Sequence, residues 1–348
     1  MLKRTLLNGL LAGTILAAAG LPAFAQTAFD GPTSGPKAAE GKTIVVLAGD
    51  LKNGGILGVT NGIEEAAAKI GWTVKVLDGA GSVQSRSAAV GQALALNPDG
   101  IVINGFDAAE QQTALEGVTA AKIPMVSWHS GPKIGCDAPG GIFANVSTDA
   151  MQVSDVAAKW ALEDAGGKPG VVIFTDSTYQ IAIDKADRMK AAIEAGGGTV
   201  LEYVDTPIAE TSTRMGPLTT TLLQKYGASW THSLAINDLY FDFMGPSLAA
   251  AGIDGKGAPK NGSAGDGSEA AFQRIRSGQY QAVTVAEPLN LQGWQLVDEL
   301  NRAIQGEACS GYITAPALVT EEGLAKTEGN TFDPDNGYRE AYAAIWGK

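Results

Sequence analysis

Side chains that can form hydrogen bonds stand at the ends of nearly all the short apolar runs in this chain. Carboxylate, amide, imidazole and hydroxyl groups recur there, in the pairs Gly49-Asp50, Asn104-Gly105, Trp128-His129, Thr175-Asp176, Asn237-Asp238, Gly265-Asp266 and Glu287-Pro288. An amide donates and accepts at once, whereas a carboxylate accepts twice and more strongly because it is charged. Such a set can pair with several hydroxyl groups of one small molecule. Leaving a buried hydroxyl unpaired costs about 1–3 kcal/mol, so the set would also discriminate.

The apolar runs alternate with Ala-rich segments of helical periodicity. The predicted strands include Thr43–Leu47, Thr73–Leu77, Gly100–Ile103, Ile123–Trp128, Gly170–Phe174, Thr199–Tyr203, Thr231–Ile236 and Ala282–Ala286. The predicted helices include Gly58–Ile70, Val83–Leu96, Ala108–Ala121, Met151–Ala165, Ala182–Ala195, Asp238–Ala251 and Leu291–Ile304. Two such series indicate an α/β protein with two doubly wound parallel-sheet lobes. Ligands of these sheets bind outside the carboxyl ends of the strands, where the polar pairs stand.

The first 25 residues have the pattern of a secretory signal peptide. Lys3 and Arg4 precede an apolar run from Leu10 to Leu21, and small residues lie two apart before Gln26. The apolar run is shorter than the ~20 residues of a membrane span, so we expect cleavage before Gln26. The mature protein is then expected in the periplasm, with residues 26–41 forming a flexible leader rich in Gly, Pro, Ser and Ala.

The net charge, the spacing of the histidines and the number of cysteines restrict the partners and sites that this chain can have. The formal net charge is −12 and no stretch of Lys and Arg forms a basic stripe, which argues against nucleic acid as a partner. The two histidines show no metal-ligand spacing, and we expect neither a metal nor a cofactor. In an oxidising compartment the two cysteines, Cys136 and Cys309, form either one disulfide or two separate thiols.

The order of these segments resembles the periplasmic sugar-binding proteins of ABC importers, of the ribose- and galactose-binding type. The resemblance extends from about Thr43 to Thr320, through Ile44–Leu47 with Asn53, Asn61–Ala66, Gly100–Asn104, Ile123–Val126, Ala235–Asp238, Ala264–Gly267 and Val285–Pro288. It implies two lobes joined by three chain crossings, near residues 146, 287 and 312. The N-terminal lobe would comprise residues 42–146 and 288–312, and the C-terminal lobe residues 147–287 and 313–348. It also favours a disulfide between Cys136 and Cys309.

The resemblance further implies which side chains contact a sugar. Asn53, Asn104, Asn237 and Asp266 keep the residue type of family positions that contact sugar, whereas Glu287 replaces a glutamine and His129 an aspartate. The family's aromatic pair is Gly55-Ile56 here, and its two arginines fall on Ser130 and Ile183. We therefore predict that Trp128, and secondarily Tyr179, supplies the apolar face for the sugar.

The missing arginines lead to an alternative ligand. Asp50, Asp176, Asp238, Asp266 and Glu287 stand at strand ends, with only Lys52 as an evident basic neighbour. Because uncompensated buried carboxylates are costly, an amine-bearing sugar such as a hexosamine would neutralise part of this charge. The other reading is that Asp50, Asp176 and Asp238 cap helices.

Other functions remain as rivals. Leu77-Asp78-Gly79-Ala80-Gly81 resembles half of a dinucleotide fingerprint, so an exported NAD-type oxidoreductase is the distant alternative. Binding of an autoinducer-like signal is a nearer one. We expect a monomeric, non-enzymatic receptor that captures a monosaccharide or polyol and delivers it to an inner-membrane ABC permease and its ATPase. A chemoreceptor is a further candidate partner.

Overall fold

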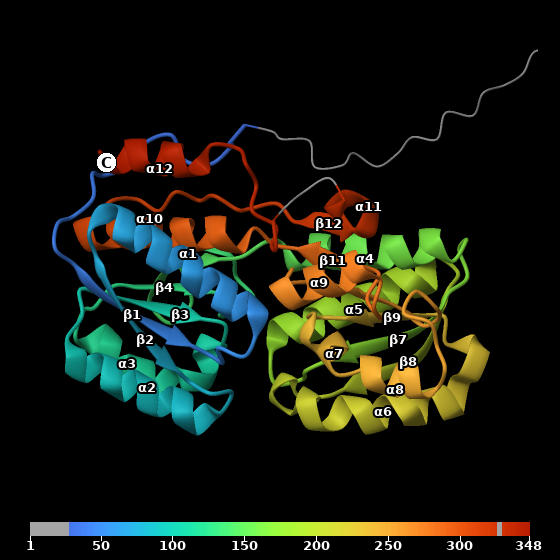
Figure 1. Cartoon of the computed structure of the whole chain (residues 1–348). Coiled ribbons are helices and arrows are strands. Elements are labelled where there is room, and N and C mark those ends of the chain that lie inside the picture. The colour runs from blue at the N-terminus through green and yellow to red at the C-terminus, as the bar shows by residue number, and fades with distance from the viewer. Residues whose placement is uncertain (1–27, 326–328) are drawn as a thin grey trace, which may run out of the picture.

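The structure is a computed structural model that describes residues 28–325 and 329–348, in which two six-stranded sheets lie side by side with helices on both sides of each (Figure 1). The predicted α/β fold with two parallel-sheet lobes is confirmed. The predicted signal peptide and its cleavage site before Gln26 lie outside the described residues. Among those described, no helix combines the length and the apolar character that a membrane span needs.

The first sheet has the strand order β2-β1-β3-β4-β6-β5, and all its pairs are parallel except β5 with β6. Its strands are β1 (Thr43–Ala48), β2 (Thr73–Asp78), β3 (Gly100–Asn104), β4 (Met125–Trp128), β5 (Gly135–Ala138) and β6 (Ile142–Val146). Asn104 lies opposite Ala48 on one side and Trp128 on the other. The register therefore brings the strand ends, and the residues that follow them, to one edge.

The second sheet has the order β12-β11-β10-β9-β7-β8, with only β12 antiparallel. Its strands are β7 (Gly170–Thr175), β8 (Thr199–Asp205), β9 (His232–Ala235), β10 (Lys260–Ser263), β11 (Val283–Ala286) and β12 (Ala317–Thr320). The helices are α1 (Gly54–Ile70), α2 (Val83–Leu96), α3 (Gln112–Ala120), α4 (Ala150–Asp164), α5 (Gln180–Ala195), α6 (Thr211–Tyr226), α7 (Leu239–Asp242), α8 (Gly245–Ala250), α9 (Glu269–Ser277), α10 (Leu289–Gln305), α11 (Glu321–Leu324) and α12 (Tyr338–Trp346).

Strand alternation builds two cores in the first lobe, which is the first sheet with α1, α2, α3, α10 and α12. Successive side chains of a strand point to opposite faces. Val46 therefore joins the core beneath α1 and α10, whereas Val45 and Leu47 join the core beneath α2 and α3. The second lobe, the second sheet with its helices, has its main core around Val172, Phe174 and further buried residues.

Two predicted helices differ from the observed ones in more than their bounds. The segment expected as a helix over Ala108–Ala121 begins with a 3-10 turn (Ala108–Gln111) before α3, because Asp107 caps Ala109 while Glu110 bonds Arg86 instead of completing a capping box. The helix expected over Asp238–Ala251 is split into α7 and α8, with a proline in the first turn of α8.

Both ends of the described chain pack against the first lobe. Residues 28–41 were expected to be a flexible leader, but Phe29 and Ala39 pack against the core beneath α10, and Ala38 donates to the Trp346 carbonyl. Helix α12 was assigned with residues 313–348 to the second lobe, but its residues Tyr342 and Trp346 belong to the core of the first. The three aromatic residues of α12 pack around Trp294 of α10 (Figure 1), which places the helix there.

Cys136 and Cys309 are joined by a disulfide, as the resemblance favoured. Cys136 lies on β5, and Cys309 follows α10. The bond therefore fastens the segment between α10 and β12 to the edge of the first sheet.

Helices α1 and α10 are in backbone contact at two glycines. A Cβ atom on Gly293 would lie 2.5 Å from the carbonyl carbon of Gly62, so only glycine permits this approach. We expect Gly293→Ala to lower the free energy of unfolding by about 3 kcal/mol, because the helices must separate. Urea denaturation would measure the change. The matched control is Gly91→Ala in α2, where a Cβ meets no atom within 4 Å and should stabilise the helix by up to ~1 kcal/mol. Equal stability of the two variants would contradict the prediction.

Candidate functional site

A cavity lies between the two lobes, at the carboxyl ends of both sheets. It contains about 640 Å³ of space free of protein atoms, part of it open to solvent. Its polar lining comes from Asp50, Asn53, His129, Tyr179, Lys185, Asn237 and Asp266, and its apolar lining includes Ile56, Trp128, Ile181, Ala182, Ile208, Ala209 and Ile236. Concave sites with apolar walls and a few convergent polar groups are typical of small-molecule binding.

Seven of the ten predicted ligand-binding residues line this cavity. They are Asp50, Asn53, Trp128, His129, Tyr179, Asn237 and Asp266. The other three, Asn104, Asp238 and Glu287, are buried and are not part of its lining. The structure therefore brings most of the predicted ligand-binding side chains together at the cavity. The remaining three lie outside its lining.

Asn104 holds helix α1 against the end of β3. Its Nδ2 donates to the Ile56 carbonyl oxygen at 3.0 Å and to the Thr60 hydroxyl at 2.9 Å, and the side chain is completely buried. Asn53 caps the same helix by accepting from Gly55 N and Ile56 N. The two amides thus position the start of α1, where Asn53 and Ile56 meet the cavity.

Asp238 holds the loop that carries Asp266. Its Oδ2 accepts from the backbone nitrogens of Gly267 and Ser268, at 2.8 Å and 3.0 Å. Its Oδ1 is bonded by Ser263 and Gln281. Asp238 therefore positions the loop that carries Asp266. The alternative reading as a helix cap is wrong for it, because its side chain forms no capping hydrogen bond to α7 and Ser268 caps α9.

Asp176 and Asp50 also bond backbone groups near strand ends. Asp176 accepts from Thr178 N and Ile208 N, and it is buried. Asp50 accepts from Lys52 N but still borders the cavity beside Gly81.

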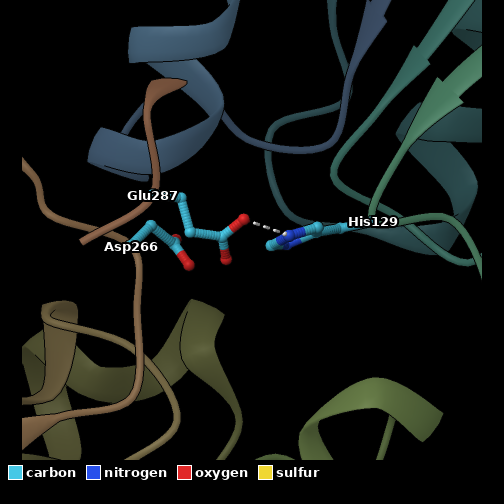
Figure 2. A group of neighbouring side chains, drawn as sticks. All are labelled: His129, Asp266 and Glu287. Atoms are coloured by element: carbon cyan, nitrogen blue, oxygen red, sulfur yellow. Dashed lines mark hydrogen bonds and ion pairs between the residues drawn. The ribbon is translucent and has the colours of Figure 1, made fainter. Parts of the chain in front are cut away.

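The most buried part of the site is a cluster of charged groups around Glu287 (Figure 2). Glu287 follows β11 and immediately precedes the chain that returns to the first lobe, and its side chain is fully buried. Its Oε2 lies 3.1 Å from His129 Nε2 and accepts from Thr148 N and Gln292 Nε2. Residues of both lobes therefore meet at one carboxylate oxygen.

Lys185 is a buried cation in this cluster that was absent from the prediction. Its Nζ donates to the Ala264 carbonyl oxygen at 2.9 Å and lies 3.8 Å from Glu287 Oε1. The expectation that no basic side chain except Lys52 accompanies the carboxylates is therefore wrong. A signal existed in the sequence, because Lys185 occupies the inward face of a helix with Ala182, Ala186 and Met189 at positions i−3, i+1 and i+4. A lysine in such a stripe needs a partner inside the protein.

The pKa values of the two buried carboxylates, Asp266 and Glu287, shift in opposite directions. Burial raises the pKa of the Asp266 carboxyl to about 6, although the Lys185 ammonium opposes the shift. Burial acts in the same direction on Glu287, but the charge and hydrogen bond of His129, followed by the charge of Lys185, outweigh it and lower the pKa of Glu287. Glu287 is thus the permanent anion of the cluster.

Trp128 does not present an open ring face as predicted, because His129 covers it. The two rings are stacked, with centroids 3.7 Å apart, and Trp128 is 2% exposed. The indole Nε1 donates to Gln292 Oε1, which in turn orients the amide that bonds Glu287. Trp128 therefore supports His129 and Gln292 and reaches the cavity only at its margin.

Tyr179 lies between the lobes. It packs against the cores of both lobes, and its hydroxyl oxygen lies 3.5 Å from Nη1 of Arg86, a residue of the first lobe. Nη2 of Arg86 itself donates to both carboxylate oxygens of Glu110. Burial raises the pKa of the Tyr179 phenol, so it stays a neutral hydrogen-bonding group at the cavity wall.

The lobes also touch directly, next to the cavity. Ideal Cβ positions on Gly54 and Gly55 would lie 2.5 Å from Ser268 Cβ and 2.3 Å from Asp266 Oδ2. The first turn of α1 therefore rests against the loop Asp266–Ser268 of the second lobe. This contact, with the pair of His129 and Glu287, describes a closed arrangement of the two lobes.

A metal ion is disfavoured by the charges of this cluster. His129, Asp266 and Glu287 each offer one ligating atom, and these atoms lie within 4.8 Å of one another. The Lys185 ammonium stands 3.8 Å from Glu287 Oε1, however, and would repel a bound cation. The donor set is better matched to hydroxyl groups, which both donate and accept.

The chain is similar in sequence to a known protein family. The model of the periplasmic binding protein domain matches residues 44–308. None of the curated proteins compared with the chain matches it.

Solved structures share the fold at low identity. A solute-binding protein of an ABC transporter from Agrobacterium vitis, with bound allitol, is 18% identical with a TM-score of 0.70, over 82% of this chain and 98% of that one. A second from A. vitis, with bound α-D-tagatopyranose, is 17% identical with a TM-score of 0.71, over 82% and 96%. The arabinose-binding component from Shewanella sp. ANA-3, bound to α- and β-L-arabinofuranose, is 17% identical with a TM-score of 0.71, over 87% and 97%.

Proposed function

This chain belongs to the periplasmic binding protein domain family, and we propose that it is a non-enzymatic receptor that closes over a monosaccharide or related polyol. It would release this ligand to an inner-membrane ABC permease with its ATPase. The predicted signal peptide supports export to the periplasm, where such a receptor works.

One observation carries the proposal. Neutral and charged hydrogen-bonding side chains from both lobes converge on a single cavity whose remaining walls are apolar. A polyol needs donors and acceptors on all sides and apolar contact for its C–H groups. Allitol, tagatopyranose and arabinofuranose, the ligands bound in the three similar structures, are molecules of this kind.

Lys185 removes the argument for an amine-bearing ligand. That argument needed carboxylates without counterions, but Glu287 has Lys185 and His129 beside it, and Asp266 accepts from Asn237 Nδ2 at 2.6 Å. Asp176 and Asp238 are occupied by backbone donors. We therefore favour a neutral ligand over a hexosamine.

A thermal-shift screen tests the function. The purified mature protein is heated with allitol, D-tagatose, L-arabinose, D-galactose, D-glucose and D-glucosamine, and positive results are measured by calorimetry. A ligand present at 100 times its dissociation constant stabilises the protein by about 2.7 kcal/mol, so a true ligand raises the melting temperature. Absence of any shift across neutral sugars and polyols would overturn the proposal.

We expect binding to weaken in acid because of Asp266. Its pKa of about 6 means that the carboxylate, the form that accepts ligand hydroxyls, is depleted below that pH. Affinity should fall about tenfold between pH 7 and pH 5, as calorimetry over this range would show. Lys185, His129, Glu287 and Asp238 also face this group. The assignment is therefore checked with Asp266→Asn, which should bind weakly with a flattened pH profile. An unchanged profile in that variant would contradict it.

A further inference from the structure

We propose that the gap between Lys185 and Glu287 is a subsite for one uncharged ligand hydroxyl, and that Lys185 determines specificity by excluding an amine from it. The inference rests on the proposed function and adds to it a position and a chemical preference.

The Lys185 ammonium has hydrogen-bonding capacity to spare. An ammonium has three protons, and among the described residues Nζ donates one hydrogen bond, to the Ala264 carbonyl oxygen. The side chain is only 4% exposed, yet Lys185 contributes to the cavity lining. The spare protons therefore serve whatever enters the cavity.

Glu287 supplies the complementary acceptor. Its Oε2 is bonded by three groups, whereas its Oε1 is buried and has no hydrogen-bond partner among the described residues. Oε1 is 3.8 Å from Lys185 Nζ, too far for a hydrogen bond. A buried charged acceptor without a partner is more costly than a neutral one, so a ligand that bonds it gains affinity.

Gly265 keeps the space beside these two atoms open. A Cβ on this residue would lie 3.0 Å from Lys185 Nζ and 3.7 Å from Glu287 Oε1. Its φ of +118° is also a conformation that side chains rarely adopt. Both the backbone and the missing side chain therefore leave room beside the pair.

A hydroxyl suits this pair better than other groups. Its oxygen can accept from the ammonium while its proton is donated to Oε1, which satisfies both. A methylene would leave both unpaired, an ether oxygen could not donate, and a ligand ammonium would be repelled by Lys185. The pair thus selects a free hydroxyl at one position of the ligand.

The test uses the wild-type protein first. Calorimetry is performed with allitol, D-tagatose, L-arabinose and D-galactose, and then with each singly deoxygenated and singly aminated form of those that bind. One deoxygenated form should bind roughly 30- to 100-fold more weakly, and the amine at that position should bind no better. Uniformly small losses at every position would overturn the subsite.

A variant assigns the effect to Lys185. Lys185→Met should lower affinity for the parent ligand by a similar factor and should no longer distinguish it from that deoxygenated form. The control is Lys190→Met, an exposed position on the same helix, which should bind like wild type. A melting curve confirms that Lys185→Met is folded, and Lys185→Gln serves if it is not.

The outcomes separate the two hypotheses. If sugars bind and Lys185→Met discriminates the analogues as wild type does, the subsite is wrong while the receptor function stands. If no sugar or polyol binds wild type, the receptor function fails and the subsite with it.

Discussion

Alanine at position 55 is expected to reduce ligand affinity by roughly 100-fold while leaving the separate lobes folded. The new Cβ would lie 2.3 Å from Asp266 Oδ2 and 2.8 Å from both Cβ and Cγ of that residue. Because three atoms of a short side chain are affected, Asp266 cannot simply rotate away. Asp266 belongs to the opposite lobe, so the clash exists only when the cleft is closed. The variant should therefore disfavour closure, and with it every contact that needs both lobes.

Calorimetry and small-angle X-ray scattering together check this prediction. Wild type should become more compact on addition of ligand, whereas Gly55→Ala should keep the dimensions of its free form. Leu57→Ala, an exposed residue in the same helix turn, is the control and should behave as wild type. Wild-type affinity and compaction in Gly55→Ala would show that the contact at Gly55 does not limit closure.

Removal of the disulfide is expected to lower the free energy of unfolding by about 2–5 kcal/mol. The bond connects cysteines 173 residues apart, so its loss releases a long loop in the unfolded chain. Denaturation of the Cys136→Ser, Cys309→Ser double variant in urea would measure the change. A reductant should shift wild type to the same midpoint and leave the variant unaffected. A midpoint equal to that of the oxidised wild type would refute the expected contribution.

Strand positions were largely predictable from the sequence. A buried parallel strand is a continuous apolar run, and its polar terminus marks the functional edge of the sheet. Asp50, His129, Asn237 and Asp266 were found in this way, and all of them line the cavity.

Site residues that lie on helices could not be predicted from the strand ends. Lys185 extends inward from the middle of α5 and reaches the cavity through its long side chain, so no strand terminus indicates it. Trp128 was misinterpreted because the backbone of His129, with a φ of 50°, places one ring against the other. The residue types in the sequence do not indicate such a local backbone conformation.

The sequence also did not indicate which lobe the two ends of the chain pack against. The aromatic residues of α12 indicate that one face of this helix is buried, but they do not indicate against which lobe it packs. The answer depends on contacts with Trp294 and with residues 28–41, all distant in sequence. Long-range packing, rather than local pattern, decides such cases.

The disulfide has a mechanical consequence. Tension applied between the two ends of the chain would pass from Cys136 directly to Cys309, bypassing everything between them. Five of the six strands of the second sheet lie in that shielded stretch, and only β12 is outside it. Under an external pull the second lobe would therefore remain nearly intact while the first lobe unfolds. After a reductant breaks the disulfide, the second lobe would bear the load as well.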